Sequence, residues 1–228
     1  MFKITAMRFA AFVLWMSSLS FTQQPPPAEV PVENEPHHHL VFENEYVRVF
    51  KVEVAPHEAT LVHRHKRDYV VVTIGDAEVT NAVVGKEPKK WSFKDGDVTF
   101  LEASGEKSFA HKAVNERGKP FRNYTIEIKT GRGVASNFDR CEGPVCHRTV
   151  AAGEGFVCET YRSPSYASSM SFPGKLRLVV PLADSMLFNR VPPETIKKYD
   201  WKWLNGNERF GSSKALVCFF DQAKVSSK

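Results

Sequence analysis

Short runs of β-branched and aromatic residues recur along this chain, and most of them end at Gly, Pro or Asp. Clear examples lie at 46–54 (YVRVFKVEV), 68–75 (DYVVVTIG), 123–129 (NYTIEIK) and 175–183 (KLRLVVPLA). Runs of this length and composition predict strands rather than helices. The one helix-like stretch, PPETIKKY, is brief. The pattern therefore predicts an all-β domain, built as a sandwich or a barrel.

An internal repeat organises these strands. At an offset of 108 residues, the segment 56–94 aligns without a gap on 164–202, and 10 of the 39 positions are identical. The aromatic Trp91 falls on Tyr199 in this alignment. A self-similarity of this kind predicts a duplicated β unit.

The N-terminus has the features of a secretory signal. Lys3 and Arg8 precede an apolar run of about ten residues, and small residues follow. A membrane span needs about 20 apolar residues, so residues 1–20 are predicted to be a cleaved signal peptide and the mature chain to lack a membrane span. The protein is thus expected to be secreted or periplasmic. Residues 21–39, rich in Pro and Glu, are expected to be a disordered leader that includes an exposed histidine tract, PHHHL at 36–40.

Charge argues against a nucleic-acid partner. The net charge is +5, but positive and negative residues are interspersed, as in KRD and KEPKK. No basic stripe with interleaved aromatic residues is present in the sequence, so nucleic-acid binding is not expected.

Four cysteines in an exported chain allow disulfides. Cys141 and Cys146 bracket a short turn-like loop and favour a local disulfide, with a zinc site that includes the adjacent His147 as the alternative. Cys158 and Cys218 both lie in apolar strand-like runs, where free buried thiols are favoured slightly over a bridge between neighbouring strands.

Candidate metal ligands gather around LVHRHKRDYVVVTIG at 61–75. Side chains of a strand alternate between faces, so His63 and His65 point the same way. Two neutral imidazoles on one face can chelate a divalent transition metal. Asp68 offers a carboxylate nearby, and His111 lies in a later strand-like segment, FAHKAVN.

These residues occur in an order that resembles the two sequence motifs of the cupin superfamily. The first motif is matched by His63, His65, Asp68, six further residues and Gly75. The second motif is matched by Gly96, a loop that holds Gly105, His111, three residues and Asn115. The spacer after His65 is shorter than in the family, Asp68 stands in place of Glu, and Glu102 stands where Pro is usual. The resemblance covers roughly residues 40–130 directly.

The resemblance implies a cupin-type double-stranded β-helix, or jelly-roll barrel, and the repeat implies that it is duplicated. The expected organisation is a barrel over 40–131, a linker with two cysteines over 132–150, and a degenerate copy over 151–228. By family analogy the metal ligands are His63, His65 and His111, with Asp68 as the fourth candidate. The repeat alignment puts Ser171 and Pro173 at the positions of His63 and His65, so the second copy is expected to lack a metal site.

Four neighbours of these ligands have predicted places. Tyr69 and Arg64 are expected on the face opposite the histidine pair, while Thr125 and Glu127 are expected to line the cavity. Asn115 is expected to hold a turn by hydrogen bonds. His57 is expected to be solvated in a turn.

Function is expected to follow from the metal. Iron or manganese would suit an oxygenase, whereas zinc or nickel would suit Lewis-acid chemistry such as isomerisation. An exported, metal-binding, small-molecule oxygenase or isomerase is one hypothesis, and a non-catalytic ligand-binding or sensing module, or an envelope scaffold, is the alternative. The expected partner is a small molecule, and the expected state is a monomer or a homodimer.

Overall fold

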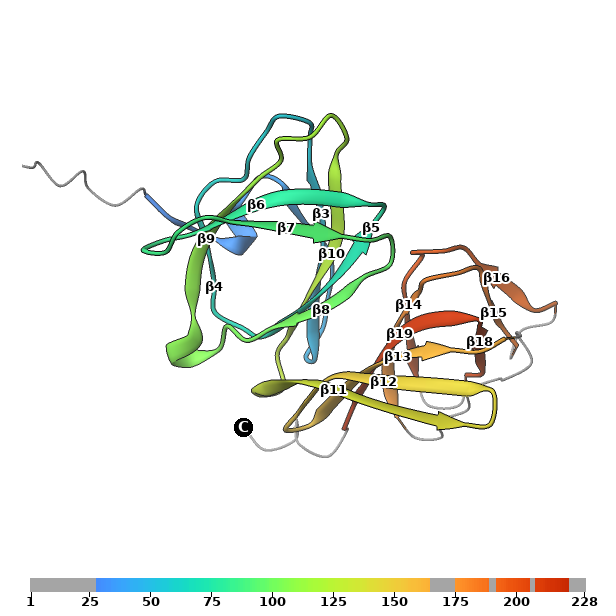
Figure 1. Ribbon diagram of the computed structural model, residues 1–228. Coiled ribbons are helices and arrows are strands. Elements are labelled where there is room, and N and C mark those ends of the chain that lie inside the picture. Colours follow the sequence, from blue (N-terminus) through green and yellow to red (C-terminus); the bar gives the residue numbers. More distant parts are fainter. Residues whose placement is uncertain (1–27, 165–174, 189–191, 206–207, 222–228) are drawn as a thin grey trace, which may run out of the picture.

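The computed structural model describes residues 28–164, 175–188, 192–205 and 208–221. The predicted signal peptide over 1–20 and the predicted counterparts of His63 and His65 at 171 and 173 lie outside these residues. Two β units lie side by side, one blue to green and the other yellow to red (Figure 1). Across the described residues, no helix is long and apolar enough to cross a membrane.

The first unit consists of two facing five-stranded sheets. Sheet A has the order β1-β4-β9-β6-β7, and sheet B has the order β2-β3-β10-β5-β8. The strands of sheet A are β1 (Val30–Pro31), β4 (His63–His65), β9 (Phe109–Val114), β6 (Ala77–Val83) and β7 (Lys89–Phe93). Those of sheet B are β2 (His38–Glu43), β3 (Val47–Val54), β10 (Phe121–Ile128), β5 (Tyr69–Ile74) and β8 (Val98–Leu101). Two short 3₁₀ turns, Val32–Asn34 and Gly105–Lys107, complete the unit.

The second unit has a six-stranded sheet C and a three-stranded sheet D. Sheet C has the order β11-β12-β13-β19-β14-β17, and sheet D has the order β16-β15-β18. The strands of sheet C are β11 (Gly133–Glu142), β12 (Val145–Gly153), β13 (Phe156–Arg162), β19 (Lys214–Phe220), β14 (Leu176–Pro181) and β17 (Lys202–Asn205). Those of sheet D are β16 (Glu194–Ile196), β15 (Ser185–Leu187) and β18 (Phe210–Ser212). The helix-like run PPETIKKY thus contains a strand, because its apolar content cannot form a helix face two turns long.

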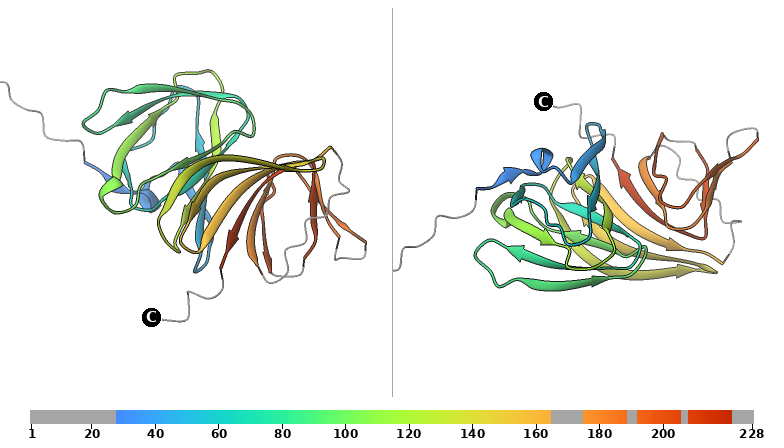
Figure 2. Two further views of the ribbon diagram at one scale, coloured as in Figure 1. Left: turned by 60° about the horizontal axis from the view of Figure 1, so that its bottom comes forward. Right: turned by 90° about the horizontal axis from the view of Figure 1, so that it is seen from above.

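Strand alternation gives sheet B two buried faces. On β3, Val47 and Val49 face the second unit, whereas Phe50, Val52 and Val54 face sheet A. The same division holds on β10 and β5, and the central hydrophobic cluster therefore combines residues of sheets B and C. A strand that is buried on both faces has a nearly continuous apolar sequence, and for this reason VVVTI at 70–74 does not alternate between apolar and polar residues. The two further views show sheet C curving alongside the first unit (Figure 2).

The strand orders confirm the duplication. The series β2-β3-β10-β5-β8 of sheet B corresponds to β12-β13-β19-β14-β17 of sheet C, and β9-β6-β7 corresponds to β18-β15-β16. Val70 and Leu178, 108 residues apart, lie opposite Ile126 and Cys218 in the two sheets. The offset does not persist, because the later loops differ in length. Trp91 lies in β7, while Tyr199 lies in a turn, so their alignment was wrong as a structural equivalence.

Two predicted boundaries need correction. From residue 30 the Pro- and Glu-rich leader is ordered, because β1 pairs with β4 and β2 pairs with β3. The expected linker over 132–150 is the strand β11 and much of β12, both within sheet C. The second unit consequently contains a histidine, His147 on β12.

Both cysteine pairs are bonded. The disulfide Cys141–Cys146 closes the β11–β12 hairpin, as predicted, and leaves no thiolates for the alternative zinc site. The expectation of free thiols at Cys158 and Cys218 was wrong. These residues lie directly opposite each other on β13 and β19, a register that separate inspection of the two apolar runs does not reveal.

Polar contacts also connect the units. Asp95, in the turn after β7, accepts a hydrogen bond from the Tyr199 hydroxyl at 2.5 Å and pairs with Lys198. Burial alone would raise the pKa of the Asp95 carboxyl, but these hydrogen bonds outweigh burial and lower the pKa to about 2. The loop that precedes β8 is therefore fixed to the second unit.

Candidate metal centre

The predicted histidines His63, His65 and His111 come together on sheet A. β4 and β9 are antiparallel neighbours, and His63 lies directly opposite His111. The ring centroids of His63 and His111 are 4.5 Å apart, and those of His63 and His65 are 5.0 Å apart. Because His63 and His65 alternate with Arg64 along one strand, both imidazoles face the interior, where each residue is 1% exposed.

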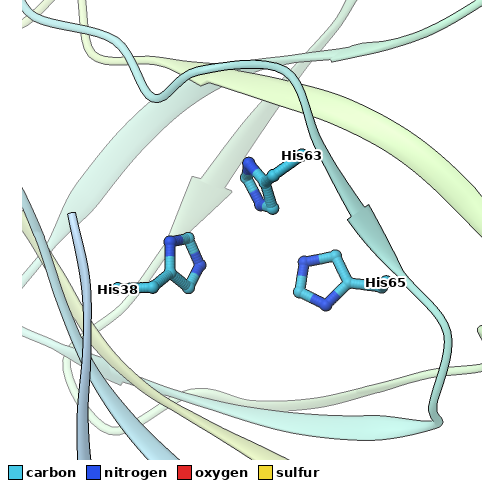
Figure 3. Close-up of side chains that lie close together, drawn as sticks. All are labelled: His38, His63 and His65. Atoms are coloured by element: carbon cyan, nitrogen blue, oxygen red, sulfur yellow. The ribbon is translucent and has the colours of Figure 1, made fainter. Parts of the chain in front are cut away.

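A fourth histidine, His38, reaches the same place from sheet B. Its ring centroid lies 4.6 Å from that of His63, and the ring is largely buried. One nitrogen from each of His38, His63 and His65 lies within 4.8 Å of the others, a set that could hold a metal ion. Figure 3 shows the three rings turned toward a common space from two sides. His38 was not among the predicted ligands, because it was assigned to the disordered leader.

The Nδ1 atoms of these histidines have partners behind the rings. His38 Nδ1 lies 2.6 Å from Glu35 Oε2, His63 Nδ1 lies 2.9 Å from the Leu61 carbonyl oxygen, and His111 Nδ1 lies 2.6 Å from Asn81 Oδ1. An Nδ1–H that donates to an oxygen leaves Nε2 with its lone pair, which is the common arrangement of metal-bound histidines.

The fourth ring, His65, follows the same arrangement more loosely. Its Nδ1 lies 3.8 Å from Glu127 Oε1. The other carboxylate oxygen, Glu127 Oε2, accepts hydrogen bonds from Arg48 at 2.5 and 2.8 Å. The pair Arg48–Glu127 thus lies behind His65 as Glu35 lies behind His38.

Burial favours the neutral form of three of these imidazoles, those of His63, His65 and His111. It lowers the pKa of His63 to about 4, with a smaller contribution from the neighbouring His38. Burial also lowers the pKa values of His65 and His111 well below the ordinary value, and the nearby His63 adds to the effect. Neutral imidazoles are the form that binds metal, so the site is ready for a cation without losing protons first.

Asp68 has a structural role instead of the predicted ligand role. Its Oδ1 accepts hydrogen bonds from the backbone N–H groups of Ala103 and Ser104 at 2.7 and 2.8 Å, and its Oδ2 accepts one from Gly133 at 2.8 Å. The side chain is 2% exposed and lies outside the histidine set. The short side chain of Asp68 reaches these backbone groups. The additional member of the histidine cluster is instead His38, from strand β2.

The predictions for the flanking residues have mixed outcomes. Arg64 points away as expected and pairs with Glu29. Tyr69 was placed on the wrong face, since its ring stacks on His65 at 4.2 Å and lines the cavity. Tyr69 lies four residues after His65, an even separation, so the alternation of strand side chains itself places both residues on one face and the expectation misapplied that alternation. Burial raises the pKa of Tyr69, which stays a protonated phenol.

The later strand supplies further cavity residues. Thr125 lines the cavity as predicted. Glu127 lies behind His65 rather than in the cavity wall, and it is 1% exposed. Asn115 donates to the carbonyl oxygens of Val54, Ala55 and Lys119, which confirms its turn-holding role.

The turns confirm one more sequence prediction and explain the two motif glycines. His57 is exposed in a turn with φ 64°. Gly75 and Gly96, the glycines of the two sequence motifs, have φ 78° and 76° in turns after β5 and β7. A residue with a side chain would be strained in this left-handed region, which explains glycine at both positions.

The cavity beside the histidines is small and mostly apolar. It has a volume of about 50 Å³ and lies between sheets A and B. Its apolar wall is formed mainly by Val52, Val54, Val71, Val79, Trp91, Phe93, Leu101 and Phe121. Its polar groups, apart from the histidines, are Thr60, Tyr69, Asn81, Thr99, Asn123 and Thr125.

The residues fit a divalent transition metal. His63 Nε2, His65 Nδ1 and His111 Nε2 are fully enclosed nitrogens without a hydrogen-bond partner among the described residues. An unpaired polar atom in a protein interior costs free energy unless a water or an ion satisfies it. The Nε2 atoms of His63 and His111 are such nitrogens, on rings held from behind through Nδ1, and a bound cation would satisfy both, while the unpaired Nδ1 of His65 is turned toward Glu127.

Comparison with known proteins gives structural matches only. No protein-family model matches the sequence, and no curated relative was found. AerE from Microcystis aeruginosa superposes with a TM-score of 0.57 at 13% identity, over 86% of this chain and 99% of that one. A salicylate 1,2-dioxygenase variant from Pseudoaminobacter salicylatoxidans, in complex with gentisate, superposes with a TM-score of 0.59 at 10% identity, over 84% of this chain and 76% of that one. The cupin 2 conserved barrel domain protein from Leptotrichia buccalis gives 0.53 at 12% identity, over 81% and 88% of the two chains.

These matches, together with the two facing sheets, show the class of fold: the chain has a cupin-like fold. More particularly, it is a duplicated cupin fold whose histidine cluster lies in the first unit and is completed from the N-terminal segment. The cupin structures similar to it include a mannose 6-phosphate isomerase from Bacillus subtilis and the dioxygenase above. At these identities the likeness shows the fold alone.

Proposed function

We propose that this protein is an exported, metal-dependent oxygenase that acts on a small organic molecule. The observation that carries the proposal is the cluster of His38, His63 and His65, with the ring of His111 beside them. In His38, His63 and His111 an oxygen lies within hydrogen-bond distance of Nδ1. His38, His63 and His65, with His111 beside them, would hold iron or manganese, metals that suit oxygenase chemistry. Such an ion would supply the oxidative chemistry, while the protein holds the ligands and excludes water.

The cavity wall favours an oxygenase over a sugar-phosphate isomerase. Among the described residues that line the cavity, none is Lys or Arg. A phosphate group is usually bound by fixed cations or by several backbone N–H groups. A small apolar cavity suits an apolar gas and a small substrate instead.

Export is part of the proposal. The N-terminal signal pattern predicts it, and two disulfides support it, because disulfides persist in oxidising compartments. We propose further that the monomer is the functional unit. In support, sheet C covers the outer face of sheet B, and residues of the two sheets form one hydrophobic cluster there. A face that is already covered within the chain does not need a partner subunit.

A non-catalytic metal-binding or sensing role is the second candidate. One observation favours it: Tyr69 and the histidines are the only titratable residues among the described ones that line the cavity. A reaction that needs a separate carboxylate as general acid or base would lack one here.

Metal analysis and oxygen uptake test the proposal together. The purified mature chain, supplied with iron or manganese, should bind about one ion per chain. A His63→Ala/His65→Ala double variant should bind none. The loaded wild type should consume dioxygen with a member of a panel of small organic substrates. Absence of bound metal contradicts the proposal, whereas bound metal without oxygen uptake or turnover across the panel favours the second candidate.

A further inference from the structure

Two neutral hydrogen-bond donors beside the histidines have no partner in the part of the chain that the structure describes. The Tyr69 hydroxyl has no hydrogen bond among the described residues. Asn123 Oδ1 accepts a hydrogen bond from the Thr125 hydroxyl at 2.9 Å, which leaves the Asn123 amide NH₂ without a partner in the same part of the chain. Neither donor atom is among the fully enclosed ones without a partner, so each remains accessible to a small molecule. Both residues are nevertheless only 3% exposed, and both line the cavity. The space that these donors face is therefore the cavity itself.

The charge around the cluster calls for an anion. Asp68 accepts backbone hydrogen bonds elsewhere, so within the described part of the chain no carboxylate belongs to the histidine set. The acidic groups Glu35 and Glu127 lie behind the rings, and Glu127 is already paired with Arg48. A divalent ion on neutral ligands keeps its positive charge, which an anionic ligand in the cavity would balance.

The size and the wall of the cavity restrict that anion. A volume of about 50 Å³ admits a ligand of only a few non-hydrogen atoms. The absence of Lys and Arg among the described lining residues disfavours phosphates and dicarboxylates, which usually bind fixed cations. Valine and aromatic side chains suit a short hydrocarbon tail.

We propose that the centre takes a short-chain monocarboxylate, whose carboxylate accepts hydrogen bonds from the Tyr69 hydroxyl and the Asn123 amide. This inference rests on the proposed function, because it assumes the metal that the histidines hold. It adds a substrate class, and it assigns Tyr69 and Asn123 as the residues that select a carboxylate of this size.

Cobalt provides a readout that is independent of activity. The mature chain is loaded with Co²⁺, and its visible absorption is followed while acetate is added. Acetate should bind saturably, and Tyr69→Phe and Asn123→Leu should each weaken its affinity about tenfold, because each removes one hydrogen bond to a charged group. Benzoate and inorganic phosphate should bind more weakly than acetate.

Matched controls separate the possible outcomes. Tyr124→Phe removes a hydroxyl from the opposite face of β10 and should leave acetate binding unchanged. Asn123→Ser serves as a second variant if the leucine variant does not fold. Equal acetate affinities in wild type and both donor variants, all with full cobalt content, would overturn this inference and leave the metal centre intact. Tighter binding of benzoate or phosphate would also overturn it. Wild-type protein that takes up no cobalt would refute the metal centre, and this inference with it.

Discussion

The role of Asp68 gives a sharp test, because the structural and the metal-ligand assignments predict opposite effects of one substitution. In the structure this carboxylate joins three separate pieces of chain. It accepts hydrogen bonds from the backbone N–H groups of Ala103 and Ser104, which follow β8, and from that of Gly133, which begins β11 in the second unit. All three bonds are 2.7–2.8 Å long, and the side chain is 2% exposed.

The expected cost follows from the number of bonds lost. Asp68→Asn can keep its oxygen toward Ala103 and Ser104, but its NH₂ then faces the Gly133 N–H, and the loss of that bond costs about 1–3 kcal/mol. Asp68→Ala leaves all three backbone donors without this partner, at a cost of roughly 3–6 kcal/mol. In a chain of this size each kcal/mol lowers the melting temperature by about 2–4 °C, so the two variants should differ clearly.

The assay combines unfolding with metal content. Both variants are unfolded in urea and by heat, with Asp200→Asn as the control, because the Asp200 side chain is 58% exposed and lies 3.5 Å from Lys202, so the substitution should shift stability by less than about 0.5 kcal/mol. Metal per chain should remain unchanged in Asp68→Asn, whereas His65→Ala should lose the metal. An Asp68→Asn protein that unfolds at the wild-type midpoint but releases its metal would refute the structural role and restore the ligand role.

Three further predictions concern other contacts. Replacing Cys158 and Cys218 together by Ala should lower stability by about 2–4 kcal/mol, measured by urea unfolding, because the disulfide closes a loop of sequence separation 60; an unchanged midpoint would mean that the bond is not formed. Glu35→Gln should weaken metal binding about 10–100-fold in a chelator competition by loosening His38, and equal affinity would argue against His38 as a ligand. The lowered pKa of Asp95 means that its stabilising effect is complete above the ordinary value of 3.8 and is lost as the pH falls to about 2. Wild-type stability should therefore fall more steeply over that range than that of Asp95→Asn, and parallel curves would contradict the contact between the units.

Much of the site was readable from local order in the sequence. His63 and His65 share a face because strands alternate, and His111 lies opposite His63 because the two strands that carry them are antiparallel neighbours. The internal repeat likewise predicted the duplication, because similar strand sequences in the same order form the same arrangement of strands. The disulfide between Cys158 and Cys218 was harder, because two apolar runs do not reveal that they are adjacent and in register.

The two errors at the site have different causes. His38 lies among three histidines at 37–39, and which of them points inward depends on where β2 begins, which composition does not reveal. The available signal was Glu35 three residues earlier, now seen bonded to His38. Tyr69 was misplaced because the alternation was misapplied: it lies four residues after His65, and an even separation along a strand returns to the same face.

The duplication also clarifies what the second unit retains. His38 lies opposite Val52 in the β2–β3 pair, and His147 lies opposite Tyr161 in the equivalent β12–β13 pair. β3 and β13 correspond residue by residue, because Val49 lies opposite Ile126 and Cys158 lies opposite the equivalent Cys218. Three residues further along, Val52 therefore corresponds to Tyr161. His147 is therefore the structural counterpart of His38.

The surroundings of these two histidines differ, and the difference explains why only one unit is predicted to bind metal. His147 Nδ1 lies 3.7 Å from Glu159, whose carboxylate already accepts a hydrogen bond from the Tyr161 hydroxyl at 3.0 Å. Arg177 occupies the position equivalent to Tyr69, and it is 1% exposed. A buried guanidinium at that position repels a cation, while the apolar side of the same strands still covers sheet B. The second unit has thus kept the strand order and the apolar face that packs on sheet B. Around His147, it has a buried arginine where the first unit has Tyr69 beside its histidine cluster.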